Sequence, residues 1–322
     1  MNEFSSNFLK NRNSEISRQS NIDARQNINN YYIALFQKGR FNCIIEDFSR
    51  NDRNRLEDEK IVNFVGLAFN SLGRLDDALL YYEKVTNIND KNADAYSNMG
   101  SIYRQKKDFN KAITFLNRAV EIEPDHFIAW NNLGNLFFEN GEYSKSLYYY
   151  KRALDINPKY CKGNYNIGNA FFRLNKFKEA KSSYRQALLI EPTNPDIIYN
   201  LAMLEEEQGN QVEALNLYYD VLNLSPDNVS CVLAIGSLLI SQEKFNEAIR
   251  FYEKAIVLKS NNTELQNNLG LAFYKNGQFT EAIKHFQKAI SISPNFAESH
   301  NNLGLLFKKL GNLSKAVKHF KI

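Results

Sequence analysis

Residues 127–160 read FIAWNNLGNLFFENGEYSKSLYYYKRALDINPKY and contain two amphipathic segments separated by a short polar break. Each segment repeats its apolar or small residues at the spacing of one helix face. These residues are Trp130, Leu133, Gly134 and Phe137 in the first segment and Tyr143, Leu147, Tyr150 and Ala153 in the second. Gly141 lies in the break, where its permissive backbone suits a turn, and Pro158 prevents the second helix from continuing. The stretch therefore predicts a helix-turn-helix unit.

The same pattern recurs along the chain with a period of about 34 residues. With Gly100 as position 8 of a unit that begins at Ala93, 13 of the 14 glycines fall at position 8 or 15. Five of the six prolines fall at position 32. Units in this register begin at Glu59, Ala93, Phe127, Cys161, Pro195, Val229, Thr263 and Ala297. Such regularity predicts a stacked array with one continuous core, and an array favours binding over catalysis.

The register also divides the chain into regions. Residues 1–24 are rich in Asn, Ser and Arg, which predicts a disordered or frayed lead-in. Residues 25–58 keep Leu35 and Gly39 on register but have Tyr32 where the first glycine belongs, so we expect a degenerate first repeat. Residues 59–322 form the array, with seven full units and a final incomplete unit from 297. Small residues at positions 8 and 20 and large rings at position 24 predict a tightly packed core.

The residue types and spacing of residues 127–160 resemble the signature of the tetratricopeptide repeat (TPR). The matching residues are Trp130, Leu133, Gly134, Phe137, Ser146, Tyr150, Ala153 and Pro158. The resemblance covers residues 59–322 well and 25–58 loosely. It implies an all-α fold, an α-solenoid of tandem helix-turn-helix TPR units that form a right-handed superhelix, and a scaffold that binds other proteins.

One face of each first helix is free for binding, because positions 2, 6, 9 and 13 lie opposite the packed positions. Position 6 carries asparagine in six units, which we call the Asn ladder: Asn98, Asn132, Asn166, Asn200, Asn268 and Asn302. Phe64 and Ala234 stand at this position in the other two units. Asparagine is a poor residue inside a helix, which indicates a role other than helix stability.

A carboxamide offers a donor and an acceptor, so it can pair with the N–H and C=O of an extended backbone. We predict that the Asn ladder, together with Asn131 and Asn135, binds extended or disordered protein segments along the concave groove. At about 0.5–1.5 kcal/mol per contact, six rungs give roughly 3–9 kcal/mol before the ordering cost, so the predicted affinity is micromolar or weaker. The ladder could also reflect composition, since roughly one residue in seven is asparagine, or duplication that copies idle residues.

The ladder and the segment 132–136 are also similar to the TPR arrays of O-linked N-acetylglucosamine transferases and related bacterial proteins. The degenerate opening unit resembles the lead-in of arrays that precede sulfotransferase, methyltransferase or glycosyltransferase domains. The resemblance implies an alternative function: recruitment of substrate to a catalytic domain beyond Ile322, with this chain as a fragment. We also expect self-association through an uncovered surface of the last unit, made of Phe307, Leu310, Val317 and Phe320.

Three local features complete the candidate surface. A clamp for a chaperone's C-terminal carboxylate is not expected, because Asn166 stands where the required Arg would follow Lys162. The unit from Val229 carries only small residues on the free face, which predicts either a hollow for a bulky partner side chain or simple drift: Ser230, Ala234, Ser237 and Ser241. Glu205 takes an apolar position, and we expect it on a solvated edge.

Composition excludes several other classes of function. The 40 Lys and Arg against 36 Asp and Glu leave a net charge of +4 without a basic stripe, so we expect no nucleic-acid partner. The sequence has no apolar run of the kind that predicts a signal peptide or a membrane span. Cys43, Cys161 and Cys231 lie far apart, and no histidine has ligands at metal spacing, so we expect a cytoplasmic protein without metal or cofactor. No catalytic constellation emerges, and we expect no enzymatic activity.

Overall fold

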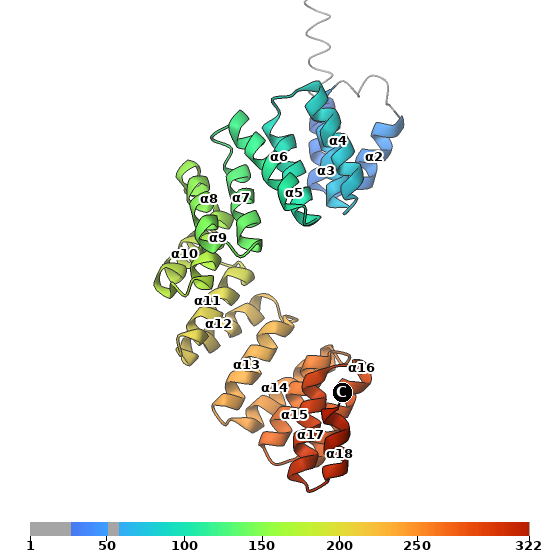
Figure 1. Ribbon diagram of the computed structural model, residues 1–322, viewed down its shortest axis with the longest axis vertical. Coiled ribbons are helices and arrows are strands. Elements are labelled where there is room, and N and C mark those ends of the chain that lie inside the picture. Colours follow the sequence, from blue (N-terminus) through green and yellow to red (C-terminus); the bar gives the residue numbers. More distant parts are fainter. Residues whose placement is uncertain (1–26, 51–57, 322) are drawn as a thin grey trace, which may run out of the picture. The chain divides into compact units, whose positions relative to one another are not determined.

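The computed structural model describes residues 27–50 and 58–321, and every regular element in these ranges is a helix (Figure 1). Residues 27–37 are helical. The elements that follow are α2 (Phe41–Arg50), α3 (Glu59–Ser71), α4 (Leu75–Ile88), α5 (Ala93–Gln105), α6 (Phe109–Ile122), α7 (Phe127–Glu139), α8 (Tyr143–Ile156), α9 (Cys161–Arg173), α10 (Phe177–Ile190), α11 (Pro195–Glu207), α12 (Gln211–Leu224), α13 (Val229–Ser241), α14 (Phe245–Leu258), α15 (Thr263–Lys275), α16 (Phe279–Ile292), α17 (Ala297–Lys309) and α18 (Leu313–Phe320). From α3 onward the odd-numbered helices are the first helices of the units, and the even-numbered helices are the second.

The turns inside the hairpins need a left-handed backbone at position 15. Gly277 has a φ of 78° there, and Lys107, Asn175 and Glu243 take the same conformation in the units that lack this glycine. At the start of the next helix, an asparagine often caps the free N–H groups. Asn262, for example, accepts from the N–H of Leu265 at 2.8 Å. The turn and cap together fix the length of each hairpin.

In most hairpins a glycine at position 8 lies against an aromatic ring at position 24, whereas Gly100 lies against Leu116. A Cβ atom on Gly270 would lie 2.8 Å from the ring of Phe286, and one on Gly66 would lie 2.8 Å from Tyr82. The rings of Tyr82 and Phe286 are fully buried. Because a side chain at position 8 would displace these rings, the small residue is required for close helix packing.

The described residues divide into two compact units, one up to residue 163 and one from residue 164. In the first unit the buried residues form two clusters, over residues 32–102 and residues 112–136. In the second unit a continuous cluster runs from Ile198 to Ala316. Each unit is therefore a stack of hairpins with its own apolar interior.

The all-α solenoid of helical hairpins predicted from the sequence is confirmed. The predicted lead-in, residues 1–24, lies outside the described residues. In the last unit Leu310, Val317 and Phe320 are about half exposed, as expected for a self-association surface, but Phe307 is buried beneath α18. No described helix is both long enough and apolar enough to cross a membrane.

Candidate functional site

The Asn ladder lies on the first helices, which contact one another directly from hairpin to hairpin. In the first unit α5 packs against α7, and in the second α13 packs against α15 and α15 against α17. All six ladder side chains are half-buried. They are therefore not idle surface amides, and part of each one faces a neighbouring hairpin.

Three of the ladder amides make the same hydrogen bond to the preceding first helix. The Nδ2 of Asn132 donates to Ser97 at 3.3 Å, that of Asn200 to the hydroxyl of Tyr165 at 2.8 Å, and that of Asn302 to Asn267 at 3.1 Å. Each bond joins position 6 to position 5 of the unit before, a separation of 35 residues. The rungs therefore connect the hairpins to one another, which the sequence did not indicate.

The asparagines at position 9 extend this polar seam toward the second helix. Asn169 accepts from Asn200 at 2.9 Å and from the hydroxyl of Tyr184 at 2.7 Å. Asn135 likewise accepts from the hydroxyl of Tyr150 at 2.9 Å. Burial raises the pKa of both tyrosine hydroxyls far above the usual range, so they remain donors. The carbonyl of Asn135 is thus engaged inside its own hairpin.

The remaining predicted asparagines differ in accessibility. Asn98 and Asn166 are half-buried, and Asn268 accepts from the Nδ2 of Asn267 at 3.3 Å. Asn131 is only 3% exposed, so it cannot touch a ligand while the hairpins stay packed. The prediction that Asn131 contacts a ligand is therefore wrong, because its side chain is buried in the packing. Asn131 occupies position 5 of its repeat, and the buried residues Ser97 and Asn267 occupy the same position in theirs.

The acceptor side of the bonded rungs remains available. The Oδ1 atoms of Asn132, Asn200 and Asn302 receive no hydrogen bond from the described part of the chain. A carbonyl oxygen with two lone pairs is a strong acceptor, and a backbone N–H is its usual partner in proteins. Each rung thus offers an oriented acceptor whose amide is already held in place.

Apolar side chains share this face in the second unit, and they were not predicted from the sequence. Met203 and Leu305, both at position 9, are 37% and 44% exposed. Leu271 lies at the same position between them and is half-buried. The signal that could have revealed them is position 9 itself, which is apolar in these three repeats but polar in the repeats of Ser101, Asn135, Asn169 and Ser237.

The gap in the ladder lies on α13. Ser230, Ser237 and Ser241 are exposed and Ala234 is half-buried, and Ser230 is hydrogen-bonded to the hydroxyl of Tyr199. Whether these small residues form a hollow or reflect drift stays open, as in the sequence.

The sequence analysis places Glu205 on a solvated edge, and the structure shows that this prediction is wrong. It is 1% exposed, and its Oε1 lies 2.5 Å from the Nζ of Lys181. Its other oxygen accepts from Asn210 at 2.8 Å. The lysine comes from the preceding hairpin, which is why the sequence position alone did not reveal the partner. This carboxylate belongs to the packing and not to the binding face.

A histidine–carboxylate pair also links α5 to the residue that precedes α7. The Nε2 of His126 lies 2.9 Å from Asp94, and its Nδ1 accepts from the N–H of Ala129 at the start of α7. The hydrogen bond from His126 lowers the pKa of Asp94. The imidazole thus caps a helix while it holds a carboxylate, which is a structural role.

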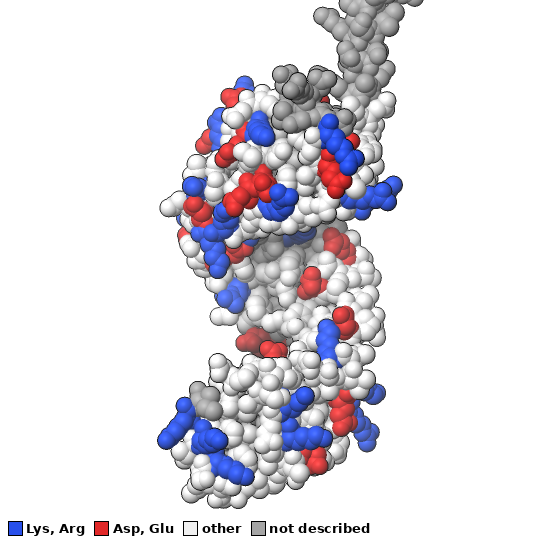
Figure 2. Space-filling model, turned by 90° about the vertical axis from the view of Figure 1, so that its right-hand side faces the viewer, with Lys and Arg blue, Asp and Glu red and all other residues white. Residues whose placement is uncertain are grey.

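Charges of both signs occur along the whole face shown in Figure 2. Among the described residues, no group of three or more His, Cys, Asp or Glu side chains could hold a metal ion. Cys43 is exposed, Cys161 and Cys231 are buried, and none of the three forms a disulfide. Burial raises the pKa of Cys231 to about 12, so this thiol stays protonated at neutral pH.

Comparisons with known proteins agree with this architecture. A family model described as TPR repeat matches residues 66–103, 168–209, 236–277 and 272–311, and one described as tetratricopeptide repeat matches residues 91–159. No curated protein matches the sequence.

Among solved structures, one from a functional characterisation of Pseudomonas aeruginosa pilF is 18% identical, with a TM-score of 0.58. The match covers 66% of this chain and 97% of that one. A chain in the APC/C hetero-tetramer Cut9-Hcn1 is also 18% identical, with a TM-score of 0.55, over 85% of this chain and 54% of that one. At this identity the likeness concerns the fold alone.

Proposed function

The chain belongs to the tetratricopeptide-repeat family, and from this premise we propose that its first helices bind extended polypeptide in each compact unit. The family and the solenoid support a protein-interaction scaffold. The accessible Asn ladder would provide the main-chain contacts, with Asn98 and Asn132 in the first unit and Asn166, Asn200, Asn268 and Asn302 in the second.

The row of available amide oxygens carries this proposal. In Asn132, Asn200 and Asn302 the Nδ2 is bound to the preceding hairpin, so the side chain is held in one rotamer with its Oδ1 available. A preorganised acceptor loses less side-chain entropy when a ligand N–H binds it. The bonds between hairpins use the Nδ2 donors, both N–H groups in Asn200, so the predicted pairing with N–H and C=O together is reduced in these rungs to an acceptor held in place for a ligand N–H.

Apolar contacts would add affinity and selectivity in the second unit. Met203 and Leu305 expose thioether and alkyl groups beside the ladder, where alternate side chains of an extended segment would lie. We therefore expect the second unit to prefer segments with apolar residues at every second position. At this place the first unit has Leu67, Ser101 and Asn135, and the second unit also has the polar Asn169 and Ser237, so the apolar contacts would come from Met203, Leu271 and Leu305.

The decisive test is whether the surface binds the main-chain N–H groups of a peptide. A binding peptide is first selected from a set of short fluorescein-labelled peptides. The same peptide is then made with N-methylated backbone amides, so that it can no longer donate hydrogen bonds from its main-chain N–H groups. We expect the methylated peptide to bind about tenfold more weakly or worse, because several N–H groups are removed.

Protein variants separate the ladder from general stability. Replacing Asn166, Asn200 and Asn302 by Ala should abolish capture by the second unit. As a matched control, Ser97→Ala in the first unit removes the partner of Asn132 but leaves the amide itself. It should weaken capture only slightly. Full capture by a folded triple variant would reject the ladder as the site.

A second candidate is recruitment of substrate polypeptide to a linked transferase domain. The observation that favours it is the resemblance of residues 132–136 to transferase-associated arrays. The same surface would then hold the segment to be modified. The coding sequence that follows the codon for Ile322 tests this candidate, because a transferase domain or an adjacent transferase gene is required.

A further inference from the structure

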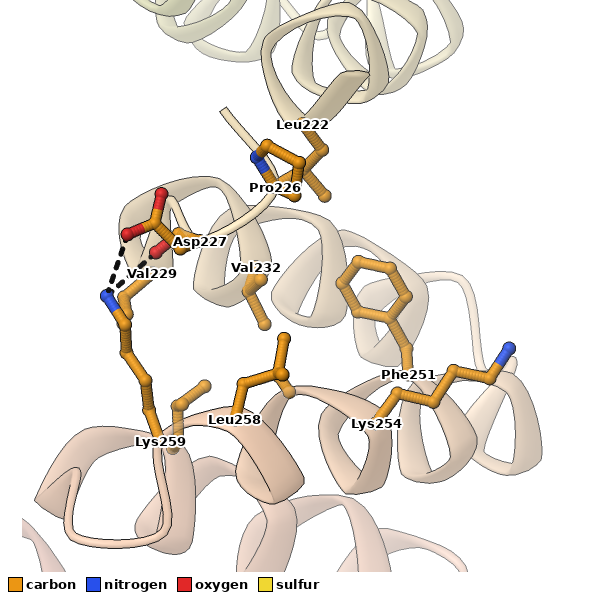
Figure 3. A pocket seen from close by; sticks show the side chains of 11 residues that line it. Leu222, Pro226, Asp227, Val229, Val232, Phe251, Lys254, Leu258 and Lys259 are labelled. Atoms are coloured by element: carbon orange, nitrogen blue, oxygen red, sulfur yellow. Dashed lines mark hydrogen bonds and ion pairs between the residues drawn. The ribbon is translucent and has the colours of Figure 1, made fainter. Parts of the chain in front are cut away.

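A second surface, separate from the Asn ladder, is an apolar pocket at the junction of α12, α13 and α14. Its volume is about 150 Å³, the size of an apolar cavity that takes up a benzene-sized ring. In Figure 3, Val232, Phe251 and Leu258 surround the open space below Leu222 and Pro226. Leu258 is 71% exposed, so the pocket opens to solvent.

Comparison with the same positions of other repeats shows that this pocket lacks a hydrogen-bond donor at position 4. In three other units the side chain at position 4 donates a hydrogen bond to the carbonyl six residues earlier, at position 32 of the preceding unit. These bonds are Trp130 to Pro124 at 2.8 Å, Gln266 to Ser260 at 3.1 Å and His300 to Pro294 at 2.9 Å. The loop carbonyl at this place therefore has a recurring donor.

The unit from Val229 lacks this donor. Position 4 is Val232, whose side chain cannot donate, and no donor among the described residues reaches the carbonyl of Pro226. Both residues line the pocket. The cavity thus lies where a larger, hydrogen-bonding side chain stands in the repeats of Trp130, Gln266 and His300.

Trp130 shows how an indole fits this place. Its ring stacks on Tyr149 with centroids 6.1 Å apart and planes inclined at 24°. The guanidinium carbon of Arg152 lies 5.6 Å from the centre of the indole. Position 23, occupied by Tyr149, is Phe251 in the pocket, and position 26, occupied by Arg152, is Lys254. The pocket therefore retains an aromatic wall, a cation and a carbonyl but no indole.

We propose that this pocket binds a tryptophan side chain from a partner polypeptide. The indole N–H donates to the carbonyl of Pro226, the ring packs on Phe251 and Val232, and the ammonium of Lys254 lies over its exposed face. The tryptophan of the partner would thus make the same contacts in this pocket, a hydrogen bond to the loop carbonyl and ring packing, that Trp130 makes within its own repeat.

Other aromatic side chains fit the place less well. Tyr96 occupies position 4 of its unit and stacks on Phe115 at 6.3 Å, but its hydroxyl makes no hydrogen bond to a described residue. A phenol therefore does not reach the loop carbonyl from this place. Phenylalanine has no donor, and the mainly hydrocarbon walls disfavour a more polar imidazole or amide.

The charges at the rim define the residue next to the tryptophan. Lys259 donates to the carbonyl of Asp227 at 2.9 Å and lies 3.6 Å from its carboxylate, so this lysine is already engaged (Figure 3). Lys254 is exposed and forms no ion pair with any described residue. An aspartate or glutamate beside the tryptophan would complement it.

Methyl-resolved NMR of the full chain, labelled at valine and leucine, tests the proposal. The probes are 3-methylindole and the peptide acetyl-GSWDSG-amide, with acetyl-GSLDSG-amide as the matched control. We expect both indole-bearing probes to shift the methyl signals of Val232 and Leu258. The leucine peptide should bind at least tenfold more weakly, and 1,3-dimethylindole, which lacks the N–H, about tenfold more weakly than 3-methylindole.

Two variants place the binding in the pocket. Val232→Trp fills the space with the side chain found in the unit of Trp130 and should abolish binding of both probes. Val257→Trp adds an indole at a neighbouring position that is 84% exposed and should leave binding unchanged. Lys254→Ala should weaken the peptide about threefold.

Three results would overturn the proposal: no shift of the Val232 and Leu258 methyl signals in the wild-type protein, equal binding by folded Val232→Trp, or binding of 3-methylindole without the peptide. The wild-type titration decides the question even if Val232→Trp does not fold. Because the pocket shares no residue with the Asn ladder, ladder variants should leave the tryptophan peptide bound, which separates this proposal from the main-chain one.

Discussion

The Nδ2 of Asn302 donates to the Oδ1 of Asn267 across 35 residues, and the hydroxyl of Ser299 donates to the same oxygen at 2.8 Å. Asn267 is fully buried and donates in turn to Glu298 at 3.0 Å. One buried amide thus joins α15 to two turns of α17.

The two asparagines of this pair should differ in their effect on stability. Asn302→Ala removes one half-exposed donor and should lower the free energy of unfolding by about 0.5–1.5 kcal/mol. Asn267→Ala leaves the buried hydroxyl of Ser299 without its acceptor and should cost more, about 1–3 kcal/mol. Urea denaturation followed by circular dichroism measures both. Asn301→Ala, an exposed neighbour on α17, should change little, and equal losses in all three variants would contradict the assignment.

The buried ion pair between Lys181 and Glu205 gives a second stability prediction. Lys181→Met leaves a buried carboxylate without its cation and should destabilise the protein by about 3 kcal/mol. The double variant Lys181→Met with Glu205→Leu removes both charges and should recover most of this loss. Thermal unfolding of the three proteins at one salt concentration compares them. A double variant no more stable than Lys181→Met would show that the pair is not the cause.

Positions 8 and 15 of one unit should respond differently to substitution, although both are glycine. Gly270→Ala places a methyl group against the ring of Phe286 and should cost about 1–3 kcal/mol. Gly277→Asn at position 15 meets no neighbour within 4 Å, and Asn175 adopts the same positive φ in its own unit. The second variant should therefore lose less stability. The reverse order in denaturant melts would rule out this account of the two glycines.

The histidine pair of the last hairpin predicts a pH effect. The Nδ1 atoms of His300 and His319 lie 3.1 Å apart. Burial, followed by the charges of His300 and Lys318, lowers the pKa of His319 below its ordinary value of about 6.5. The unfolded chain therefore binds the proton more tightly, so stability should be complete above about pH 6.5 and fall as the pH drops toward the folded-state pKa.

His300→Gln provides the matched control, because Gln266 already pairs with His285 at 2.8 Å in the preceding unit. Without a second imidazole, the variant should lose less stability between about pH 7.5 and about pH 5.5. Urea midpoints at the two pH values measure the difference. Identical acid sensitivity in both proteins would show that the pair does not contribute.

Much of this structure could be predicted from the sequence, because the hairpins depend on residues inside one unit. Gly270 and Phe286 recur with their spacing, and their contact follows from the helix period. The partners of the ladder could not be predicted in the same way. Ser97, Tyr165 and Asn267 play one role with three different side chains, so no residue type marks the position. Glu205 was misplaced for a related reason, since its cation belongs to another hairpin.

The rungs have one spacing, 35 residues, while the units repeat every 34 or so. Excision or duplication of one whole unit would leave position 6 of each hairpin beside position 5 of whichever hairpin now precedes it. The rung is kept where the new neighbour carries an acceptor at position 5, as Ser97, Tyr165 and Asn267 do, and is lost beside Leu233. The surface that holds a ligand would then grow or shrink in steps of one rung.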